Sequence, residues 1–240
     1  MNLIIDVGNT RIKIAVFENS EMIYNEVFTK VNFMKSVFDV IEKYNCKYAI
    51  IASVGSIKKS EINLLKNKIN LIDLNFETKI PFRNEYETPQ TLGVDRIALV
   101  SAAVSKYPNK NTLIIDAGTC ITYDFVDDKA CYHGGAISPG IKMRYKALNK
   151  FTQKLPLLEP EYIDELIGNS TKTSIHLGVI KGVISEIDGF IEQYRKKNKD
   201  LTVVLTGGDV NFLANRLKNS IFANPNFLLE GLNSILTYNI

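Results

Sequence analysis

The 240-residue sequence has no tryptophan, only two histidines and only three cysteines. Cys46, Cys120 and Cys131 lack the spacing of metal ligands, so we expect reduced thiols and a cytoplasmic protein. No apolar stretch is long enough to span a bilayer, and Asp6 interrupts the first apolar run. We therefore expect neither a signal peptide nor a membrane partner.

A strong charge of one sign is also absent. The net charge is +3, and the lysines and arginines are scattered apart from the short basic run 194–199. This run ends a predicted helix, where cations suit the helix dipole, so no nucleic-acid partner is expected. The sequence also has no Pro/Ser-rich linker and no low-complexity segment. Its length allows one large domain or two small ones.

The most informative feature is a repeated strand–turn–strand pattern. The turn Asp6-Val7-Gly8-Asn9-Thr10 follows the apolar run 3–5 and precedes the alternating run 12–16. A similar turn, Asp116-Ala117-Gly118-Thr119, follows the apolar run 113–115 and precedes the run 121–126. This repetition predicts an internal duplication with two similar halves facing one another.

Both turns have the residues of a phosphate-binding loop. Glycine removes the side chain that would keep a polyanion away, and backbone N–H groups can then point at phosphate oxygens together with the hydroxyl of Thr10 or Thr119. Asp6 and Asp116 suit a cation, or its water, that neutralises phosphate charge. The alternative for each turn is an ordinary Asp-Gly hairpin. Two copies in matched settings favour phosphate.

The remaining pattern predicts an α/β unit in each half. A buried strand over 201–206 runs directly into Gly207-Gly208-Asp209, a placement that suits a nucleotide. We also expect Gly55-Ser56 to form a ligand-facing loop. The predicted elements are strands over 2–6, 11–17, 21–28, 48–54, 70–74, 112–116, 121–126 and 129–132, helices over 33–44, 60–69, 141–150, 170–194, 211–217 and 227–240, and a glycine-rich turn over 134–140.

Both turns, together with Gly93-Val94-Asp95-Arg96 and the glycine-rich segment 134–140, occur in this order in the type III pantothenate kinases. The sequence resembles this family over nearly its whole length. The resemblance implies a duplicated actin-like (ribonuclease H-like) α/β fold, with a nucleotide cleft between lobes 1–110 and 111–240. It also implies ATP-dependent phosphorylation of pantothenate to 4′-phosphopantothenate, the first step of coenzyme A biosynthesis.

The chemistry of phosphoryl transfer agrees with these motifs, because such an enzyme needs a phosphate cradle, cations and a group that orients the attacking hydroxyl. Asp95 is the candidate general base, and Arg96 is suited to a bidentate contact with the carboxylate of pantothenate. The alternative is that Asp95 is the N-cap of the helix that follows. Tyr86 and Thr171 could likewise be a loop aromatic and a helix N-cap.

The resemblance further implies a requirement for potassium or ammonium, with Asp116 as the cation ligand, in addition to magnesium with ATP. It implies a homodimer, for which the helix after Ser170 is a candidate interface, although its apolar positions could equally be core. The implied site residues are Asp6, Val7, Gly8, Asn9, Thr10, Arg11, Ile12, Lys13 and Thr119 for ATP, and Tyr86, Gly93, Val94, Asp95, Arg96 and Thr171 for pantothenate.

Two other functions remain open. One is a kinase or phosphatase of the same fold that acts on a different small hydroxy compound. The other is a nucleotide-binding regulatory protein, for which Asp95 discriminates because a pure sensor needs no base. Cys120 stands where the family more often has alanine, and adds an oxidisable thiol. We predict no role for His133 or His176.

Overall fold

The computed structural model describes residues 1–8, 11–29, 33–53 and 57–240. Asn9, Thr10 and the predicted loop Gly55-Ser56 lie outside these ranges. The described chain divides into two compact units, each of which is described here by itself. Unit 1 comprises Met1–Asn109, Lys129–Tyr132 and Asn226–Ile240, and unit 2 comprises Lys110–Asp128 and His133–Pro225.

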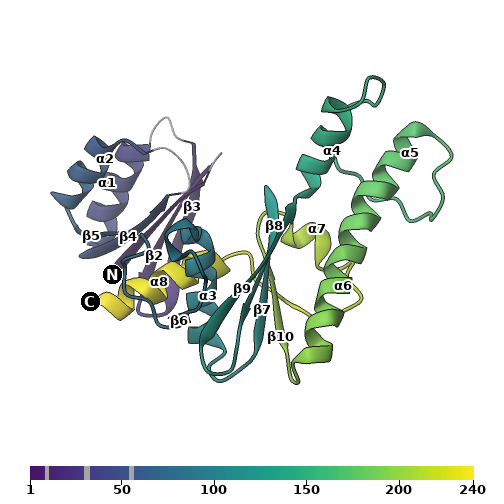
Figure 1. Ribbon diagram of the computed structural model, residues 1–240. Coiled ribbons are helices and arrows are strands. Elements are labelled where there is room, and N and C mark those ends of the chain that lie inside the picture. Colours follow the sequence, from purple (N-terminus) through teal and green to yellow (C-terminus); the bar gives the residue numbers. More distant parts are fainter. Residues whose placement is uncertain (9–10, 30–32, 54–56) are drawn as a thin grey trace. The chain divides into compact units, whose positions relative to one another are not determined.

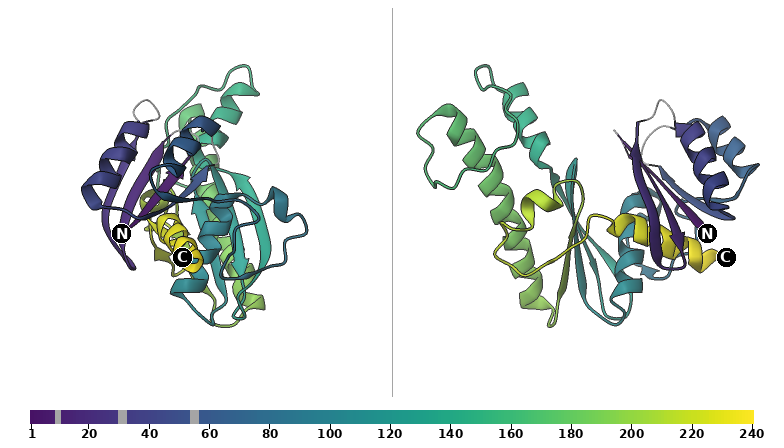
Figure 2. Two further views of the ribbon diagram at one scale, coloured as in Figure 1. Left: turned by 90° about the vertical axis from the view of Figure 1, so that its left-hand side faces the viewer. Right: turned by 180° about the vertical axis from the view of Figure 1, so that it is seen from behind.

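The helices and strands of unit 1 are β1 (Asn2–Val7), β2 (Ile12–Glu18), β3 (Glu21–Phe28), α1 (Phe33–Tyr44), β4 (Tyr48–Ser53), α2 (Lys59–Lys66), β5 (Asn70–Asp73), β6 (Arg83–Asn84), α3 (Val94–Lys106) and α8 (Phe227–Asn239). The main sheet has the order β3-β2-β1-β4-β5. β1 pairs antiparallel with β2 and parallel with β4. Helices α1 and α2 cover one face of this sheet (Figures 1 and 2), and α8 and α3 pack on the other.

Alternation of apolar side chains explains this layered arrangement, because successive residues of a strand point to opposite faces. Leu3 and Ile5 of β1 pack with Phe33 and Val37 of α1 in one buried cluster. On α8, Gly231 permits close approach to α3, since a Cβ at this position would lie 1.9 Å from the carbonyl oxygen of Ala98. The two helices that complete unit 1 therefore come from distant parts of the sequence.

The elements of unit 2 are β7 (Thr112–Ala117), β8 (Cys120–Val126), β9 (Cys131–Pro139, which begins in unit 1), α4 (Ile141–Lys150), α5 (Thr171–His176), a π-helical turn (Leu177–Lys181), α6 (Gly182–Lys197), β10 (Thr202–Thr206), α7 (Val210–Leu213) and β11 (Phe222–Ala223). The strands follow the order β11-β10-β7-β8-β9, with β6 next to the start of β9. β7 pairs antiparallel with β8 and parallel with β10. Ile180, Val183 and Ile187 pack with Leu113 and Ile115 in the core of this unit.

The strand order of unit 2 repeats that of unit 1. In each unit an antiparallel neighbour flanks one side of the first strand, and parallel strands follow on the other side. This repetition confirms the duplicated α/β fold that the two turns predicted. The two functional lobes, 1–110 and 111–240, remain a prediction. In the structure α8 belongs to unit 1, although it lies at the C-terminal end of the chain.

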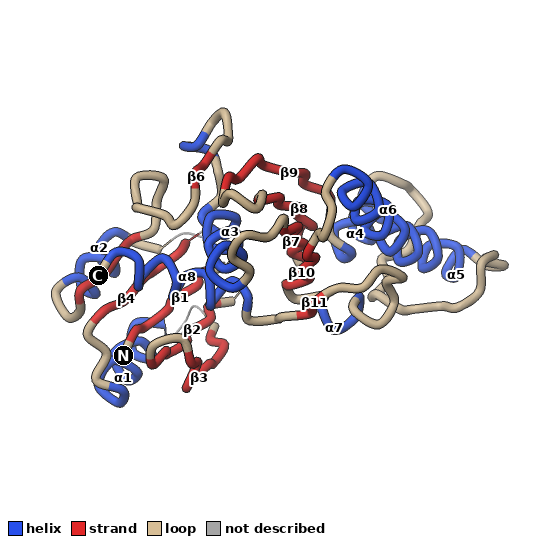
Figure 3. Tube along the Cα trace, turned by 90° about the horizontal axis from the view of Figure 1, so that it is seen from below, coloured by secondary structure: helices blue, strands red, loops and turns tan. Residues whose placement is uncertain are grey.

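Three predicted elements differ most from the structure. The segment 134–140 is not a turn but continues β9 as far as Pro139. A Cβ at position 135 would lie 1.5 Å from the carbonyl oxygen of Tyr123, so glycine lets the two strands approach closely. The predicted helix 170–194 is one helical stretch from α5 to α6 (Figure 3), in which Leu177–Lys181 forms a π-helical turn. The helix predicted over 211–217 is only Val210–Leu213. No helix in the described residues has the length and apolar character needed to cross a membrane.

Candidate active site

The turn that follows β1 places a carboxylate opposite a lysine. Asp6 lies at the end of β1, and its cross-strand partner on β2 is Lys13. The turn is closed by a hydrogen bond from the Gly8 N–H to the Arg11 carbonyl oxygen at 3.0 Å. The Gly8 backbone also has little space, since a Cβ there would lie 3.1 Å from the same oxygen. Of the predicted ATP-binding residues, Asn9 and Thr10 are outside the described chain.

Asp6 is electrostatically coupled to the predicted catalytic residue. Burial raises the pKa of Asp6 to about 6, the charge of Lys13 lowers it, and the negative charge of Asp95 raises it further. The structure therefore brings the carboxylates of Asp6 and Asp95 into one part of unit 1, although they are far apart in the sequence. Asp6 is the candidate to hold a cation beside phosphate, and Asp95 is the candidate to accept the proton of the attacking hydroxyl.

The segment 93–96 forms the start of α3. Gly93 is the N-cap, and Asp95 is the second residue of the helix, so the alternative that Asp95 caps this helix is wrong. Its Oδ1 accepts a hydrogen bond from the Arg96 N–H at 2.9 Å. A Cβ at Gly93 would lie 2.3 Å from that oxygen, so glycine at this position leaves room for the carboxylate.

Arg96 lies among aromatic rings. Its side chain is buried, with only 5% of the residue exposed. The guanidinium carbon is 5.5 Å from the centre of the Tyr86 ring and 6.0 Å from that of Tyr132, and the two rings are stacked with their centres 6.2 Å apart. The structure thus brings together the predicted substrate residues Tyr86 and Arg96. Sequence reasoning missed Tyr132, whose position depends on the parallel pairing of β9 with β6.

The second turn, in unit 2, is one residue shorter between its paired strands. Ala117 pairs directly with Ile121, whereas Val7 pairs with Ile12 in unit 1. The Gly118 N–H donates to the Cys120 carbonyl oxygen at 2.9 Å, and Thr119 is exposed at the tip. The hydroxyl of Thr119 is therefore accessible to a ligand, as its predicted contact with ATP requires.

The loop after β10 lies against the second turn. Gly207 has φ +95°, and a Cβ there would lie 2.3 Å from both Asp116 Oδ1 and the Ala117 carbonyl oxygen. The Asp209 N–H donates to that carbonyl oxygen at 2.9 Å. Burial raises the pKa of Asp209, and the charge of Lys142 lowers it. The predicted cation ligand and the predicted nucleotide loop are thus adjacent, and Lys142 is a nearby cation that sequence reasoning missed.

Oxygen donors of this kind fit the cation that the family resemblance implies. Hard cations prefer carboxylate and carbonyl oxygens, and the Asp116 carboxylate and the Ala117 carbonyl supply one of each on the same side of Gly207. Among the described residues, no three or more His, Cys, Asp or Glu side chains are grouped so that they could hold a metal.

Thr171 is the first residue of α5, and Ser170 rather than Thr171 is the N-cap. The Ser170 side chain accepts a hydrogen bond from the Thr173 N–H at 3.2 Å. Thr171 lines a groove of about 890 Å³ in unit 2, together with Arg144, Phe151 and Ser174. Thr171 therefore belongs to unit 2, as do Asp116 and Thr119, whereas the other predicted substrate residues belong to unit 1.

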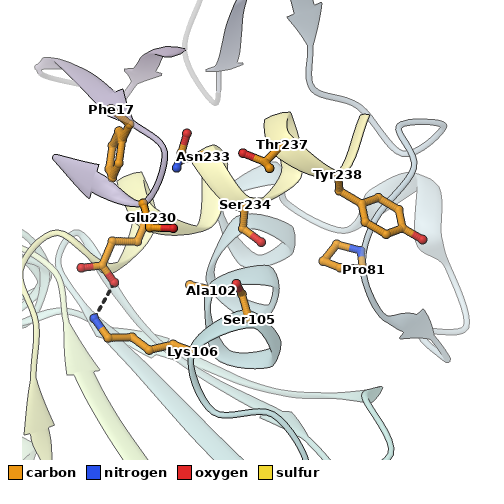
Figure 4. A pocket seen from close by; sticks show the side chains of 11 residues that line it. Phe17, Pro81, Ala102, Ser105, Lys106, Glu230, Asn233, Ser234, Thr237 and Tyr238 are labelled. Carbon is orange, nitrogen blue, oxygen red and sulfur yellow. Dashed lines mark hydrogen bonds and ion pairs between the residues drawn. The ribbon is translucent and has the colours of Figure 1, made fainter. Parts of the chain in front are cut away.

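A further groove, of about 620 Å³, lies in unit 1 between α3 and α8 (Figure 4). The Lys106 Nζ to Glu230 Oε2 ion pair, at 2.8 Å, forms part of its wall. Hydroxyl groups of Ser105 and Ser234 line it as well. None of the predicted site residues lines this groove, so it is separate from the candidate active site.

Solved structures of other proteins share this fold. A ROK family glucokinase from Streptomyces griseus has a TM-score of 0.54 and 7% identity, with 99% of this chain and 98% of the other covered. A Campylobacter jejuni protein assigned to the Baf family of transcriptional activators has a TM-score of 0.66 and 23% identity, with the same coverage. These identities show the fold alone. The repeated sheets, with a carboxylate at the end of each first strand, define a protein of the duplicated actin-like α/β fold class.

Sequence comparison identifies the family within this class. The family model described as type III pantothenate kinase matches residues 2–193. The Type III pantothenate kinase of Christiangramia forsetii is 52% identical over 100% of this chain and 99% of its own length. The chain therefore belongs to the type III pantothenate kinase family, and it is a kinase.

Proposed function

We propose that this protein transfers the γ-phosphoryl group of ATP to the 4′-hydroxyl of pantothenate, the first step of coenzyme A biosynthesis. Family membership supports the reaction. The observation that carries it is the coupling of Asp6, beside a phosphate turn, to Asp95 at the start of α3. A nucleotide sensor would need the Asp6 carboxylate beside the phosphates, but it would not need Asp95 as a base.

In the proposed reaction, Asp95 accepts the proton of the 4′-hydroxyl as that oxygen attacks the γ-phosphorus. The new P–O bond forms on pantothenate while the bond to the leaving ADP oxygen breaks. Arg96 binds the pantothenate carboxylate, and Tyr86, Gly93, Val94 and Thr171 complete the substrate site. The burial of Arg96 against two tyrosines supports this role, because a desolvated guanidinium binds a carboxylate more strongly than an exposed one does.

On the nucleotide side, the turn from Asp6 to Lys13 and the hydroxyl of Thr119 contact the phosphates of ATP. Lys13 lies opposite Asp6 on the neighbouring strand, which is where its charge can serve phosphate and carboxylate alike. Asp116 would hold a potassium or ammonium ion. This ion, together with magnesium bound to ATP, would supply positive charge that stabilises the phosphates.

The first test is ADP release by the purified protein with ATP and magnesium. We expect release to depend on pantothenate, to need potassium or ammonium rather than sodium, and to stop when pantothenate is replaced by its 4′-deoxy analogue. The analogue keeps the carboxylate that Arg96 would bind, so it separates binding from transfer. Nucleotide binding without pantothenate-dependent release in any salt would refute the proposed reaction, and a screen of other small hydroxy compounds would follow.

We also propose that the protein is a homodimer. Phe151, Leu166 and Ile167, all in the segment between α4 and α5, are 80%, 84% and 83% exposed, and a second chain would cover them. The apolar positions of the helix after Ser170 are core residues of unit 2, which favours core over interface as the role of that helix face. Sedimentation equilibrium is expected to give the mass of two chains, and a Leu166→Glu, Ile167→Glu variant that of one. A wild-type mass of one chain would refute the dimer.

A further inference from the structure

Arg144 is the centre of a hydrogen-bond network in unit 2, called the clamp here. None of the predicted site residues belongs to it. It lies in the first half of α4. Its Nε donates to the Pro139 carbonyl oxygen at 2.8 Å, and its Nη2 donates to Ser138 Oγ at 2.8 Å and to Glu186 Oε2 at 2.6 Å. Tyr123 on β8 donates to the other carboxylate oxygen of Glu186 at 3.0 Å. The clamp therefore joins β8, the end of β9, α4 and α6.

The clamp is sheltered from solvent. The side chains of Arg144 and Glu186 are 22% and 25% exposed. Burial raises the pKa of Glu186, but the hydrogen bonds from Arg144, Ser138 and Tyr123 lower it, and the net result lies below its usual range. Glu186 is thus ionised at neutral pH. The contacts of Arg144 with two residues of β9 give the end of that strand a defined position.

The residue that follows this clamped segment supports the second phosphate turn. The Gly140 N–H donates to the Thr119 carbonyl oxygen at 3.1 Å. A Cβ at Gly140 would lie 2.1 Å from the Gly118 carbonyl oxygen and 2.5 Å from that of Thr119, so the two backbones are in direct contact. A shift of 138–140 would therefore shift the turn.

A simple packing role does not explain the choice of residues. Exposed ion pairs contribute little to stability, and buried ones contribute little compared with apolar side chains of similar volume, so a half-buried pair is not explained by stability alone. A guanidinium, by contrast, fixes direction, because its planar donors bond several acceptors at set angles. Phosphoryl transfer depends mainly on such positioning, since small displacements of a phosphate-binding group lower the rate.

We propose that Arg144 and Glu186 are positioning residues for ATP, which act by holding Ser138-Pro139-Gly140 against the second phosphate turn. This inference rests on the proposed function, because it takes that turn to bind the phosphates. Neither residue contacts the reacting atoms. Loss of the clamp should therefore weaken ATP binding more than pantothenate binding.

The test compares Arg144→Met, Arg144→Lys and Glu186→Gln with Arg195→Met. Arg195 also bonds unit 2 acceptors, Asn219 and the Ser220 carbonyl at 2.9 Å, but not the phosphate turn. We expect Arg144→Met to raise both the KM for ATP and the Kd for a non-hydrolysable ATP analogue at least tenfold. The KM for pantothenate should change less than twofold. Arg144→Lys should recover only part of the loss, because an ammonium cannot reproduce the planar contacts.

Several outcomes would overturn the proposal. One is that Arg144→Met binds the ATP analogue as tightly as wild type does. Another is that the KM for ATP and the KM for pantothenate rise equally, in proportion to the loss of thermal stability. A third is that Arg195→Met shows the same kinetic change. Glu186→Gln keeps the shape of the side chain and serves if Arg144→Met fails to fold. The analogue-binding comparison does not depend on pantothenate turnover, so failure of the clamp and failure of the proposed reaction can be told apart.

Discussion

Replacement of Asp95 by asparagine is expected to lower kcat for pantothenate phosphorylation by about 10²- to 10⁴-fold, the range that a general base contributes. The amide cannot take the proton of the 4′-hydroxyl. It can still accept the hydrogen bond from the Arg96 N–H that Asp95 accepts at 2.9 Å, so the start of α3 should persist. The Kd of ATP, measured by calorimetry, should change little. The effect should therefore appear in kcat and not in nucleotide binding.

Glu61→Gln is the matched control. Glu61 is also an acidic residue in the first turn of a helix of unit 1, and its carboxylate accepts the Lys58 N–H at 3.0 Å. Both substitutions remove a negative charge near a helix N-terminus, which costs a few tenths to about 1 kcal/mol of stability. In Asp95→Asn, relief of the repulsion with Asp6 offsets part of this cost. Only Asp95→Asn should affect turnover. Full turnover in Asp95→Asn would remove this residue from the mechanism.

Replacement of Asp6 by asparagine is expected to make the nucleotide-free protein more stable above pH 6 and at the same time inactive. The partly buried carboxylate has a pKa of about 6 in the folded protein, raised from its ordinary value of 3.8. Such a shift corresponds to a penalty of up to about 3 kcal/mol for keeping the ionised group folded. Asparagine removes this charge, but it cannot hold a cation beside phosphate as a carboxylate does.

The pH dependence follows from the direction of that shift. Below pH 3.8 the Asp6 carboxyl is protonated in both the folded and the unfolded protein, so it does not change the free energy of unfolding. Between pH 3.8 and about 6 the unfolded chain has released the proton while the folded chain retains it, so stability falls as the pH rises. Above about pH 6 the full penalty applies. The difference in melting temperature between Asp6→Asn and wild type should therefore appear over this window and then stay constant.

Thermal unfolding from pH 3 to pH 8 measures this difference, with Asp73→Asn as the control. Asp73 also ends a strand of unit 1 but is exposed, so its substitution should leave the pH profile unchanged. Magnesium with an ATP analogue should raise the melting temperature of wild type more than that of Asp6→Asn. A variant less stable than wild type at pH 8 would contradict the assigned burial cost of Asp6.

Much of the candidate site was predictable because its signals are local. Asp6 lies near the end of a strand, and Gly8 and Gly118 stand in the short turns between paired strands, so the carboxylate and the glycines are conspicuous in the sequence. Gly93-Val94-Asp95-Arg96 was recognisable by resemblance. Tyr132 was not predictable, because its contact with Arg96 depends on a parallel pairing between segments distant in sequence.

The glycine-rich segment shows why a local signal can mislead. Glycines over 134–140 predict a turn when only their freedom of backbone conformation is considered. In the structure, Gly135 is required by the close approach of β8, and Gly140 by the close approach of Gly118 and Thr119 in the second turn. Both are contacts with residues elsewhere in the chain, so composition alone could not distinguish strand from turn.

The sequence by itself determined most of the strands and helices, the two turns and the duplication, because periodicity and turn residues act over a few positions. Only the tertiary structure decided which charges meet. It brings Asp6 near Asp95, Asp116 beside Gly207 and Arg144 onto Glu186, through strand pairing and helix packing between distant segments. Burial and electrostatic coupling depend on three-dimensional distance, which no local pattern contains.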